Sequence, residues 1–371
     1  MTNYRTYSFD ELFLPIEKGT SKFTEYAIYR SLESEGDLVP LWGGNHEHDS
    51  VNQFVSVNAK NKDNEQIKIF EGECIIISLD GSAGSMTYKA KGEKFALNHH
   101  AGVLRCKDRS KLNLQYFKYR YENALKGLAI SDGSKTLSKR QLEKEFFELP
   151  DLEEQEVILS RYLKLASMKK EIKECLAKID QLQSKKLESI SSEEETLIAL
   201  TTLFDLNQGH QITDYELYYT EGDIPVYTGN NELKGHWNKS IVKNEDLPCL
   251  SYPSKGNAGI VFVHDVIFDA NNTAILIPKK EWREKISLDW FRFKLPFLFL
   301  EIMTSKGGVS YLNREIVEKI QIPLIKKISQ ENEAVVLKKF ENLKNKLEIL
   351  FERIDVNLNR EVFVDNIKHL V

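Results

Sequence analysis

The sequence predicts an α+β protein with two similar globular domains in tandem, each followed by a long helix, and with the two helices paired as an antiparallel coiled coil. Three observations predict this fold class: the chain repeats itself once, each copy contains short apolar strands, and each copy is followed by a run with coiled-coil spacing. The 371 residues suit two or three domains. We place the four parts at residues 1–150, 151–195, 196–325 and 326–371.

The repeat consists of seven blocks in the same order. The clearest is LQYFKYRY at 114–121, which matches LDWFRFKL at 288–295 in its leucine, aromatic and basic positions. Phe13 with Gly19 matches Phe204 with Gly209, VPLWGGN ending at Asn45 matches IPVYTGN ending at Asn230, and loop 81–84 matches loop 256–259. The segment at 99–100 matches 271–272, segment 131–135 matches 306–310, and LPDLEEQ at 149–155 matches IPLIKKISQ at 322–330 with two extra residues. Chance similarity does not produce this collinear order, so we infer a tandem duplication.

Within each copy, apolar runs rich in β-branched residues predict buried strands. They cover 74–79 in the first copy, and 260–268 and 274–277 in the second. The repeated aromatic and basic segment predicts a helix. Its aromatic rings suit base stacking, but helical spacing that is kept in both copies favours core packing for Tyr116, Phe117, Tyr119, Trp290, Phe291 and Phe293.

After each copy the sequence predicts a helix of a coiled coil. No Gly or Pro occurs from Glu153 to Glu195, and apolar residues recur at a/d spacing at Leu165, Met168, Ile172, Cys175, Ile179 and Leu182. The second stripe is Val336, Phe340, Leu343, Leu347, Leu350, Ile354 and Leu358. A helix of about 35 residues is roughly 50 Å long, so a pair would form a rigid spacer. The alternative is two independent amphipathic helices, each packed on its own globular core.

Composition excludes several classes of protein. Lys plus Arg is 51 and Asp plus Glu is 56, so the net charge of −5 excludes a uniformly basic nucleic-acid binder but not locally basic faces. No apolar stretch approaches the roughly 20 residues of a membrane span, and MTNYRTYSFDEL carries no signal-peptide core. The four cysteines are scattered without a C-x-x-C pair. We therefore expect a cytoplasmic protein with reduced thiols and no membrane association.

Two segments are locally basic. Residues 89–126 hold ten basic and three acidic side chains, and residues 279–294 hold six and three. Such faces neutralise phosphates and release counterions, although solvated surface charge is the other interpretation. Loops with Asn, His and Lys suit base edges, because Asn pairs with adenine and Lys with guanine. Gly-rich turns let backbone N–H groups approach phosphates, and turn geometry alone explains these glycines equally well.

These considerations give two sets of candidate DNA contacts. Those of the first copy are Gly44, Asn45, His46, Gly81, Ser82, Lys89, Lys91, Lys94, His99, His100, Ser134, Lys135 and Thr136. Those of the second copy are Asn230, Asn231, Lys234, Ser254, Lys255, Asn257, Asn271, Asn272, Lys306 and Ser310. Matched positions of different residue type are what two domains that read different sequences would show.

Motifs for catalysis are missing. Ser134-Lys135-Thr136 lacks the upstream glycine of a Walker A loop, no Asn-Pro-Pro-aromatic run exists for amino methylation of a base, and Gly81-Ser82-Ala83-Gly84 does not have the spacing of G-x-S-x-G. The histidines at 46, 48, 99 and 100 lack the Cys or carboxylate partners of a metal site. We expect no catalytic residue, no metal and no cofactor in this chain.

This organisation resembles the DNA-specificity subunit of type I restriction–modification systems. The resemblance covers almost the whole chain; its local marks are DGSAG at 80–84 with SKGNAG at 254–259, and ELPDLEEQ at 148–155, which is similar to the Pro-x-x-x-x-Gln entry to the family's conserved helix. The resemblance implies a non-catalytic adaptor. Each globular target-recognition domain would read one half of a bipartite double-stranded DNA site, and the paired helices would set the gap between the halves.

The same resemblance implies partners and where their cofactors bind. Two methyltransferase (modification) subunits would dock on the helices and bind S-adenosylmethionine, and restriction subunits would bind ATP with magnesium. Alternatives remain: the specificity subunit of a type IIB-like system, a self-contained nuclease or methyltransferase fragment, or a structural coiled-coil protein whose heads bind protein. Activity of the chain alone, or a lack of salt-dependent DNA affinity, would distinguish these alternatives.

Overall fold

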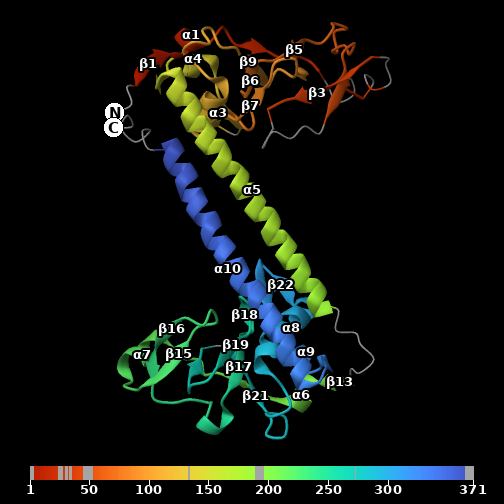
Figure 1. Cartoon of the computed structure of the whole chain (residues 1–371), viewed down its shortest axis with the longest axis vertical. Coiled ribbons are helices and arrows are strands. Elements are labelled where there is room, and N and C mark those ends of the chain that lie inside the picture. Colours follow the sequence, from red (N-terminus) through yellow and green to blue (C-terminus); the bar gives the residue numbers. More distant parts are fainter. Residues whose placement is uncertain are drawn as a thin grey trace. The chain divides into compact units, whose positions relative to one another are not determined.

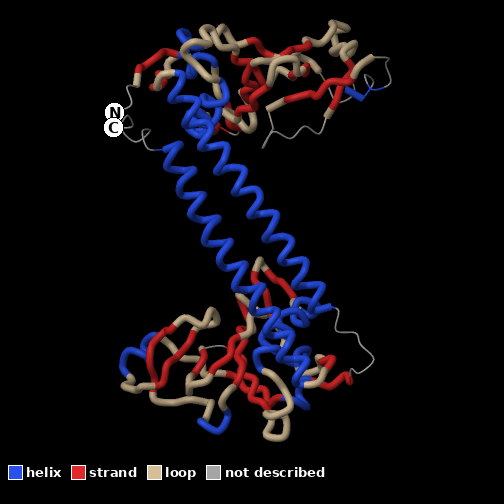
Figure 2. Tube along the Cα trace, in the orientation of Figure 1, coloured by secondary structure: helices blue, strands red, loops and turns tan. Residues whose placement is uncertain are grey.

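A computed structural model describes residues 4–23, 28, 29, 32, 36–44, 53–132, 134–188, 196–271 and 273–363. The chain divides into two compact units, residues 1–171 with 351–371 and residues 172–350. Each unit holds one globular head and parts of two long helices, α5 (Leu152–Glu188) and α10 (Lys327–Phe363) (Figure 1). Strands and loops predominate in both heads (Figure 2). In the described part of the chain, no helix has the length and apolar character needed to cross a bilayer.

The first head is built from two four-stranded sheets. One sheet has the order β2-β9-β6-β7 and the other β4-β3-β8-β5, in which β3 and β8 are parallel. Two strands at the ends of the head, β1 and β12, pair with each other, and β10 with β11 forms a hairpin. The bounds are β1 Arg5–Ser8, α1 Phe9–Leu12, β2 Glu17–Lys18, β3 Leu38–Trp42, β4 Phe54–Ser56, β5 Ile69–Glu71, β6 Cys74–Ser78, β7 Met86–Lys89, β8 Lys94–Leu97, β9 Ala101–Leu104, α3 Leu114–Leu128, β10 Ile130–Asp132, β11 Ser134–Thr136, α4 Lys139–Leu142 and β12 Phe146–Leu149.

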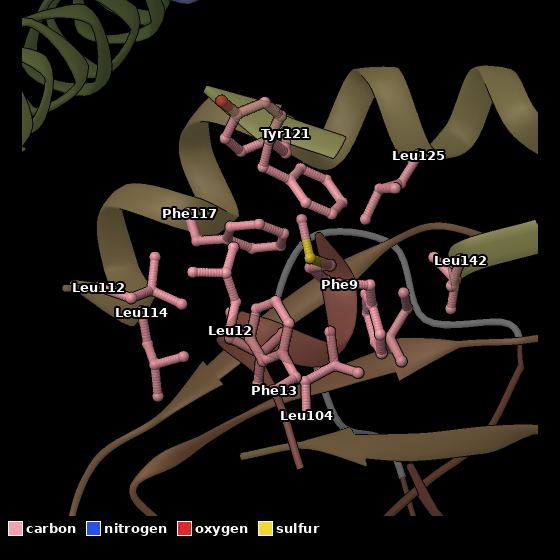
Figure 3. Packing of buried hydrophobic residues seen from close by; sticks show 14 of the residues in the cluster. Phe9, Leu12, Phe13, Leu104, Leu112, Leu114, Phe117, Tyr121, Leu125 and Leu142 are labelled. Atoms are coloured by element: carbon pink, nitrogen blue, oxygen red, sulfur yellow. The ribbon is translucent and has the colours of Figure 1, made fainter. Parts of the chain in front are cut away.

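The core of this head lies between helix α3 and strands β6 and β7. Strand β6, CIIIS, is buried along its whole length, as its run of β-branched residues predicts. The rings of Phe13 and Phe117 meet edge to face at 4.8 Å, with Phe9 and Tyr121 beside them (Figure 3). Tyr116 and Phe117 are buried, so the prediction that the repeated aromatics pack in a core is confirmed for them, while Tyr119 is half-buried with its ring 4.4 Å from that of Tyr162 in α5.

The second head repeats these elements. Its two larger sheets have the orders β14-β21-β17-β19 and β16-β15-β20, with β15 and β20 parallel. Strands β22 and β23 form a hairpin like that of β10 and β11, and β18 adds a third strand to it. The bounds are β13 Thr196–Ala199, α6 Leu200–Leu203, β14 Phe204–Gln208, α7 Asp214–Tyr219, β15 Ile224–Tyr227, β16 Leu233–Trp237, η1 Asn244–Asp246, β17 Cys249–Pro253, β18 Lys255–Gly256, β19 Phe262–His264, β20 Asp269–Ala270, β21 Thr273–Pro278, α8 Leu288–Ile302, β22 Thr304–Lys306, β23 Val309–Tyr311, α9 Arg314–Val317 and β24 Gln321–Leu324. Helix α8 has the same length as α3, and Trp290, Phe291 and Phe293 are buried in it.

The structure corrects the register of one repeat block. The backbone N–H of Asn98 donates to Trp42 O at 3.0 Å, and that of Asn271 donates to Tyr227 O at 3.0 Å. Trp42 and Tyr227 end the two equivalent parallel strands. The counterpart of Asn271 is therefore Asn98, and not His99 as the sequence alignment predicts.

The entry to each long helix is fixed by a buried glutamine. Gln155 Oε1 accepts the backbone N–H of Asn113 at 2.9 Å, and its Nε2 donates to Lys111 O at 2.8 Å and to Pro150 O at 2.9 Å. Both Gln155 and Gln330 are completely buried. The Pro-x-x-x-x-Gln motif thus joins the head to its helix.

In the second head Gln330 repeats these contacts. Gln330 Oε1 accepts the N–H of Ser287 at 2.7 Å, and its Nε2 donates to Ile325 O at 2.7 Å. Ile325 therefore takes the place of Pro150, five residues before the glutamine. The prediction of two extra residues in the second junction is wrong. The junction has the same length in both heads, and the proline of the second head lies two positions earlier, inside β24.

Within the unit 172–350, α5 and α10 run antiparallel. Asp180 pairs with Lys344 at 2.8 Å and Lys186 with Glu333 at 3.2 Å, so residue numbers fall along α10 as they rise along α5. Leu187 and Leu337 pack together with Phe293 of the head. In the other unit, Lys169 pairs with Asp355 and its ammonium lies 4.9 Å from the centre of the Phe351 ring. The predicted antiparallel pairing of the helices is confirmed in the unit 172–350, and in the other unit the two helices are in contact at Lys169.

The buried row of each helix differs from the predicted stripe. On α5 the buried and half-buried positions include 165, 169, 172, 176, 179, 183 and 186, and on α10 they include 337, 340, 344, 347, 351, 354 and 358. Ile172, Ile179, Ile354 and Leu358 are buried, and Leu165, Phe340 and Leu347 are half-buried, as predicted. The prediction is wrong for residues that the structure exposes: Met168, Cys175, Leu182, Val336, Leu343 and Leu350.

The cause of this difference is that each helix carries two adjacent apolar rows. Only one row can face the other helix. The row that faces the other helix includes Lys169 and Lys344. The ammonium group of each lysine pairs with a carboxylate of the opposite helix, while its aliphatic chain lies between the helices.

Candidate nucleic-acid interface

The glycine turn of the first head is required by backbone geometry. It follows β6 and leads into β7, with Gly81 at φ 76° and Gly84 at φ 87°. A Cβ on Gly84 would lie 2.5 Å from the backbone N of Lys126. The turn of the second head has the same conformation, with Gly256 at φ 80° and Gly259 at φ 95°. Positive φ is the conformation that glycine adopts without a steric penalty, so turn geometry explains these residues.

Six predicted residues of the first head come together around this turn. The N–H of Gly81 donates to Lys135 O at 2.9 Å, and that of Ser82 donates to Gly44 O at 2.7 Å. Asp80 bridges to Thr136 in the hairpin, and its carboxylate bonds His100 Nδ1 at 2.9 Å. Because each amide has one hydrogen, the N–H groups of Gly81 and Ser82 are taken, so the structure does not support them as a phosphate cradle.

The two neighbouring histidines have different surroundings. The ring of exposed His99 lies 3.8 Å from that of His100, centre to centre. Burial, and then the neighbouring His100, lower the pKa of His99. A neutral ring offers one donor and one acceptor, which suits base edges better than phosphate.

Three of the four predicted lysines of the first head, Lys89, Lys91 and Lys94, lie away from this turn, whereas Lys135 lies at it. Lys89 pairs across from Cys74, at the end of β6 opposite to the turn, and Lys94 begins β8, whose other end leads to His99. The Lys89 ammonium lies 4.5 Å from the centre of the Trp42 ring and 3.2 Å from Glu93. Lys91 lies in the exposed turn between them.

The rest of the basic segment disperses as well. Arg109 pairs with Glu73 at 2.7 Å, Lys126 pairs with Glu122 at 3.0 Å, and Lys118 and Arg120 are buried. Part of the local positive charge is thus taken up in ion pairs or buried within the head.

In the second head the predicted residues gather around the equivalent turn. Asn257 donates to Asn230 through their side-chain amides. Gly256 pairs with Ser310 across β18 and β23, Ser254 O accepts the N–H of Leu312 at 2.9 Å, and the Lys255 ammonium lies 5.6 Å from the Tyr311 ring centre. Asn231 closes a turn at φ 60°, with its N–H on Thr228 O.

Asn271 and Lys234 have structural contacts of their own. Asn271 Oδ1 accepts the N–H of Ile212 at 3.1 Å, and its Nδ2 donates to Ile212 O at 2.9 Å. The Lys234 ammonium donates to the same carbonyl at 2.9 Å and pairs with Asp214 at 2.9 Å. One edge of the Asn271 amide is therefore occupied by the backbone. The remaining candidates Asn45, His46 and Asn272, and the side chains of Ser134 and Lys306, lie outside the described residues.

A histidine–carboxylate pair in the second head was not predicted from the sequence. His210 Nδ1 lies 2.6 Å from Oδ2 of Asp269, which is completely buried in β20. The available signal was the isolated Asp269 in an apolar, strand-forming segment, because a buried carboxylate needs a partner. In the described part of the chain, no group of three or more His, Cys, Asp or Glu is placed to bind a metal ion.

A second histidine of this head is buried. His264 Nε2 lies 2.8 Å from Ser251 Oγ, and its ring stacks on Phe268 at 3.8 Å. Burial lowers the pKa of His264 to about 4. This neutral, enclosed histidine is part of the core of the head.

Comparison with known proteins identifies the duplicated heads. The family described as the type I restriction modification DNA specificity domain matches the chain twice, at residues 7–184 and 194–352. The chain belongs to this family. Its two matches correspond to the two heads with the long helices that follow them, and the family's role is DNA specificity.

Solved structures share the fold of this specificity protein. The S subunit of the type I restriction–modification system of M. genitalium is 16% identical, with 97% of this chain and 95% of that chain covered and a TM-score of 0.61. A chain from a study of complex assembly and conformational transition of the type I system is 12% identical, covers 98% and 97%, and has a TM-score of 0.55. No curated protein sequence matches the chain.

Proposed function

We propose that each head reads one half of a bipartite double-stranded DNA site as part of a type I restriction–modification complex. One observation carries this proposal. The two heads share their strands, glycine turns and helix junctions, yet they place different residues around the turn: Asp80 and His100 in the first head, Lys255 and Asn257 in the second. Two heads with the same backbone framework but different polar side chains are suited to recognise two different half-sites.

The helices are proposed to act as a spacer and as the docking site of two methyltransferase subunits. Each helix is continuous over 37 residues, and each buries one row against the other within its unit. The adjacent apolar row stays exposed, with Leu182 at 52%, Leu343 at 47% and Leu350 at 41%. A contiguous exposed apolar row is a feature of protein-binding surfaces, which supports docking along the helices.

The chain is proposed to work as a non-catalytic adaptor in the cytoplasm. In this proposal the methyltransferase subunits bind S-adenosylmethionine and the restriction subunits bind ATP with magnesium. The support is that the histidines in the described structure have structural or surface positions, and that the family describes a specificity domain.

The proposal is tested by selection of DNA. The full chain, co-expressed with its methyltransferase subunits, should retain duplexes that share two short sequences separated by a fixed, non-specific gap. Methylation mapping of host DNA should return the same two sequences. A complex that binds and methylates without any bipartite preference would contradict the proposal, and methylation by the purified chain alone would contradict the adaptor role.

The spacer role has a separate test. Inserting one heptad after Ile179 and one near Leu347 lengthens both helices by about 10 Å, since each residue adds 1.5 Å. The gap between half-sites should grow by about three base pairs at 3.4 Å each, while the two recognised sequences stay the same. Insertion in α5 alone is the control and should disrupt the pairing. An unchanged gap after the paired insertion would show that the helices do not set the spacing.

A further inference from the structure

The pair of His210 and Asp269 is built to hold one imidazole in a fixed position. His210 follows Gly209, whose N–H bonds Thr273 O in β21. Asp269 Oδ1 accepts the N–H groups of His210 at 3.1 Å and of Ala270 at 2.8 Å, while Oδ2 lies 2.6 Å from His210 Nδ1. Both oxygens of this completely buried carboxylate are thus occupied by nearby donors.

This contact decides the chemistry of the exposed ring edge. A carboxylate only accepts hydrogen bonds, so the Nδ1 of His210 carries the hydrogen. With the hydrogen on Nδ1, the Nε2 atom of a neutral imidazole has a free lone pair. Among the described residues none bonds Nε2, and the side chain is 38% exposed. The ring is supported by Trp237, edge to face at 5.2 Å.

The segment that carries His210 is clamped to the same strand end. Ile212 is bonded through both its N–H and its carbonyl to the Asn271 amide, and the carbonyl also accepts from Lys234. A side chain whose backbone and ring are both fixed loses little conformational freedom on binding, which is a requirement for a precise reading atom.

His210 is connected to the predicted contacts of the second head by a series of hydrogen bonds. Asn271, two residues after Asp269, bonds Tyr227 O at the end of β15. The turn that follows β15 carries Asn230, which bonds Asn257 of the glycine turn. In the first head, Gly19 is followed by buried Thr20, and Ala96 stands at the strand position of Asp269, so the pair is specific to one head.

We propose that His210 is a specificity-determining residue of the second head, and that Asp269 is its positioning residue. This inference rests on the proposed function. The Nε2 atom accepts a hydrogen bond from an exocyclic amino group of a base in the major groove, N6 of adenine or N4 of cytosine. A phosphate oxygen is not a partner for this atom, because both atoms only accept.

The test uses the full chain with its methyltransferase subunits and a pool of duplexes in which every base pair of both half-sites is varied. His210→Ala should lose discrimination at one position of one half-site, by roughly 5- to 150-fold, the range that corresponds to one base contact. Preferences at the other positions, and in the other half-site, should stay. His236→Ala, a substitution at an exposed histidine of the same head, is the matched control and should leave every preference unchanged.

Asp269→Asn tests the positioning role with a readout that simple destabilisation does not produce. Its Oδ1 can still accept the two backbone N–H groups, but Nδ2 donates to His210 Nδ1 and moves the ring hydrogen to Nε2. The variant should then favour a base with an acceptor, such as guanine or thymine, at the position where the parent favours an amino group.

Each outcome decides a different claim. An equal loss of affinity of His210→Ala for all sequences, with a smaller salt dependence, would identify a phosphate contact and overturn the inference. Unchanged preferences in both His210→Ala and Asp269→Asn, with thermal unfolding like the parent, would overturn it as well. If the parent itself selects no bipartite sequence, the proposed function fails, and the inference fails with it.

Discussion

The glycine turns of the two heads have the same backbone but opposite charges at the residue before them. In the first head Asp80 precedes the turn and holds His100, while in the second head Lys255 occupies that place and lies over Tyr311. Both residues pair with the equivalent hairpin strand, Asp80 with Thr136 and Lys255 with Tyr311. The comparison separates two kinds of residue: those that build the frame, which the heads share, and those that the frame displays, which differ.

Of the features that both heads share, the buried glutamine at the helix junction should be the most sensitive to substitution. Gln155→Leu leaves three buried or partly buried backbone groups without this partner, at roughly 1–3 kcal/mol each, so the first head should lose roughly 3–9 kcal/mol of stability. Gln330→Leu leaves two such groups and should cost the second head roughly 2–6 kcal/mol. Hydrogen exchange of α3 and α8 in the full chain measures the two effects separately.

The control for the glutamine pair is Gln181→Leu, at an exposed position of α5, which should change stability by less than about 0.5 kcal/mol. If Gln155→Leu were as well tolerated as this control, the buried amide would not be what joins the head to its helix.

A buried histidine should make the heads respond differently to acid. Burial lowers the pKa of His264 from 6.5 to about 4, so protonation favours the unfolded chain. The stabilising contribution of the neutral ring is complete above pH 6.5 and is lost as the pH falls towards 4, by roughly 3 kcal/mol in total. In the first head Lys89 occupies the matching position, since it pairs across from Cys74 as His264 does from Cys249, so no histidine is buried there.

Hydrogen exchange of β17 against β6 between pH 7 and pH 4 measures this difference after correction for the intrinsic rates. The second head should lose more protection than the first. His264→Gln retains a hydrogen-bonding partner for Ser251 but does not titrate, so it should remove most of the excess loss. Equal losses in both heads of the parent would mean that His264 is accessible to protons in the folded state.

The shared framework of the two heads can be predicted from the sequence, because the residues that build it are of the same type in both copies. The aromatic segments of α3 and α8 and the glycines at matched turns are recognisable in both copies. Register is harder to predict, since the bond from Asn98 to Trp42 joins residues far apart in the chain. The sequence also does not determine which face of each long helix packs against the other, because adjacent rows, such as those that contain Ile179 and Leu182, are both apolar.

The displayed residues were predicted only in part. Residues within the matched loops, such as Asn230 and Asn257, come together as expected. The basic segment disperses because Lys118 and Arg120 are buried and other basic side chains form ion pairs, some of them with distant carboxylates, as Arg109 does with Glu73. His210 and Asp269 are 59 residues apart, and neither belongs to a recognisable motif.

The second glycine of each turn offers the finest comparison of the two frames. Gly84 and Gly259 share a positive φ, which costs a residue with a Cβ about 1 kcal/mol. At Gly84 that Cβ would also meet the backbone of Leu125 and Lys126 at 2.5–2.7 Å, whereas at Gly259 its nearest neighbour is the Phe299 Cβ at 3.7 Å. Gly84→Ala should therefore cost roughly 2–4 kcal/mol and Gly259→Ala about 1 kcal/mol.

Urea unfolding of the full chain, followed by hydrogen exchange in α3 and α8, measures both costs. Gly92→Ala is the control, because Gly92 has a positive φ with open space around it, and its cost should match that of Gly259→Ala. Equal costs at all three positions would mean that φ alone requires these glycines and that close contact between turn and helix in the first head adds nothing.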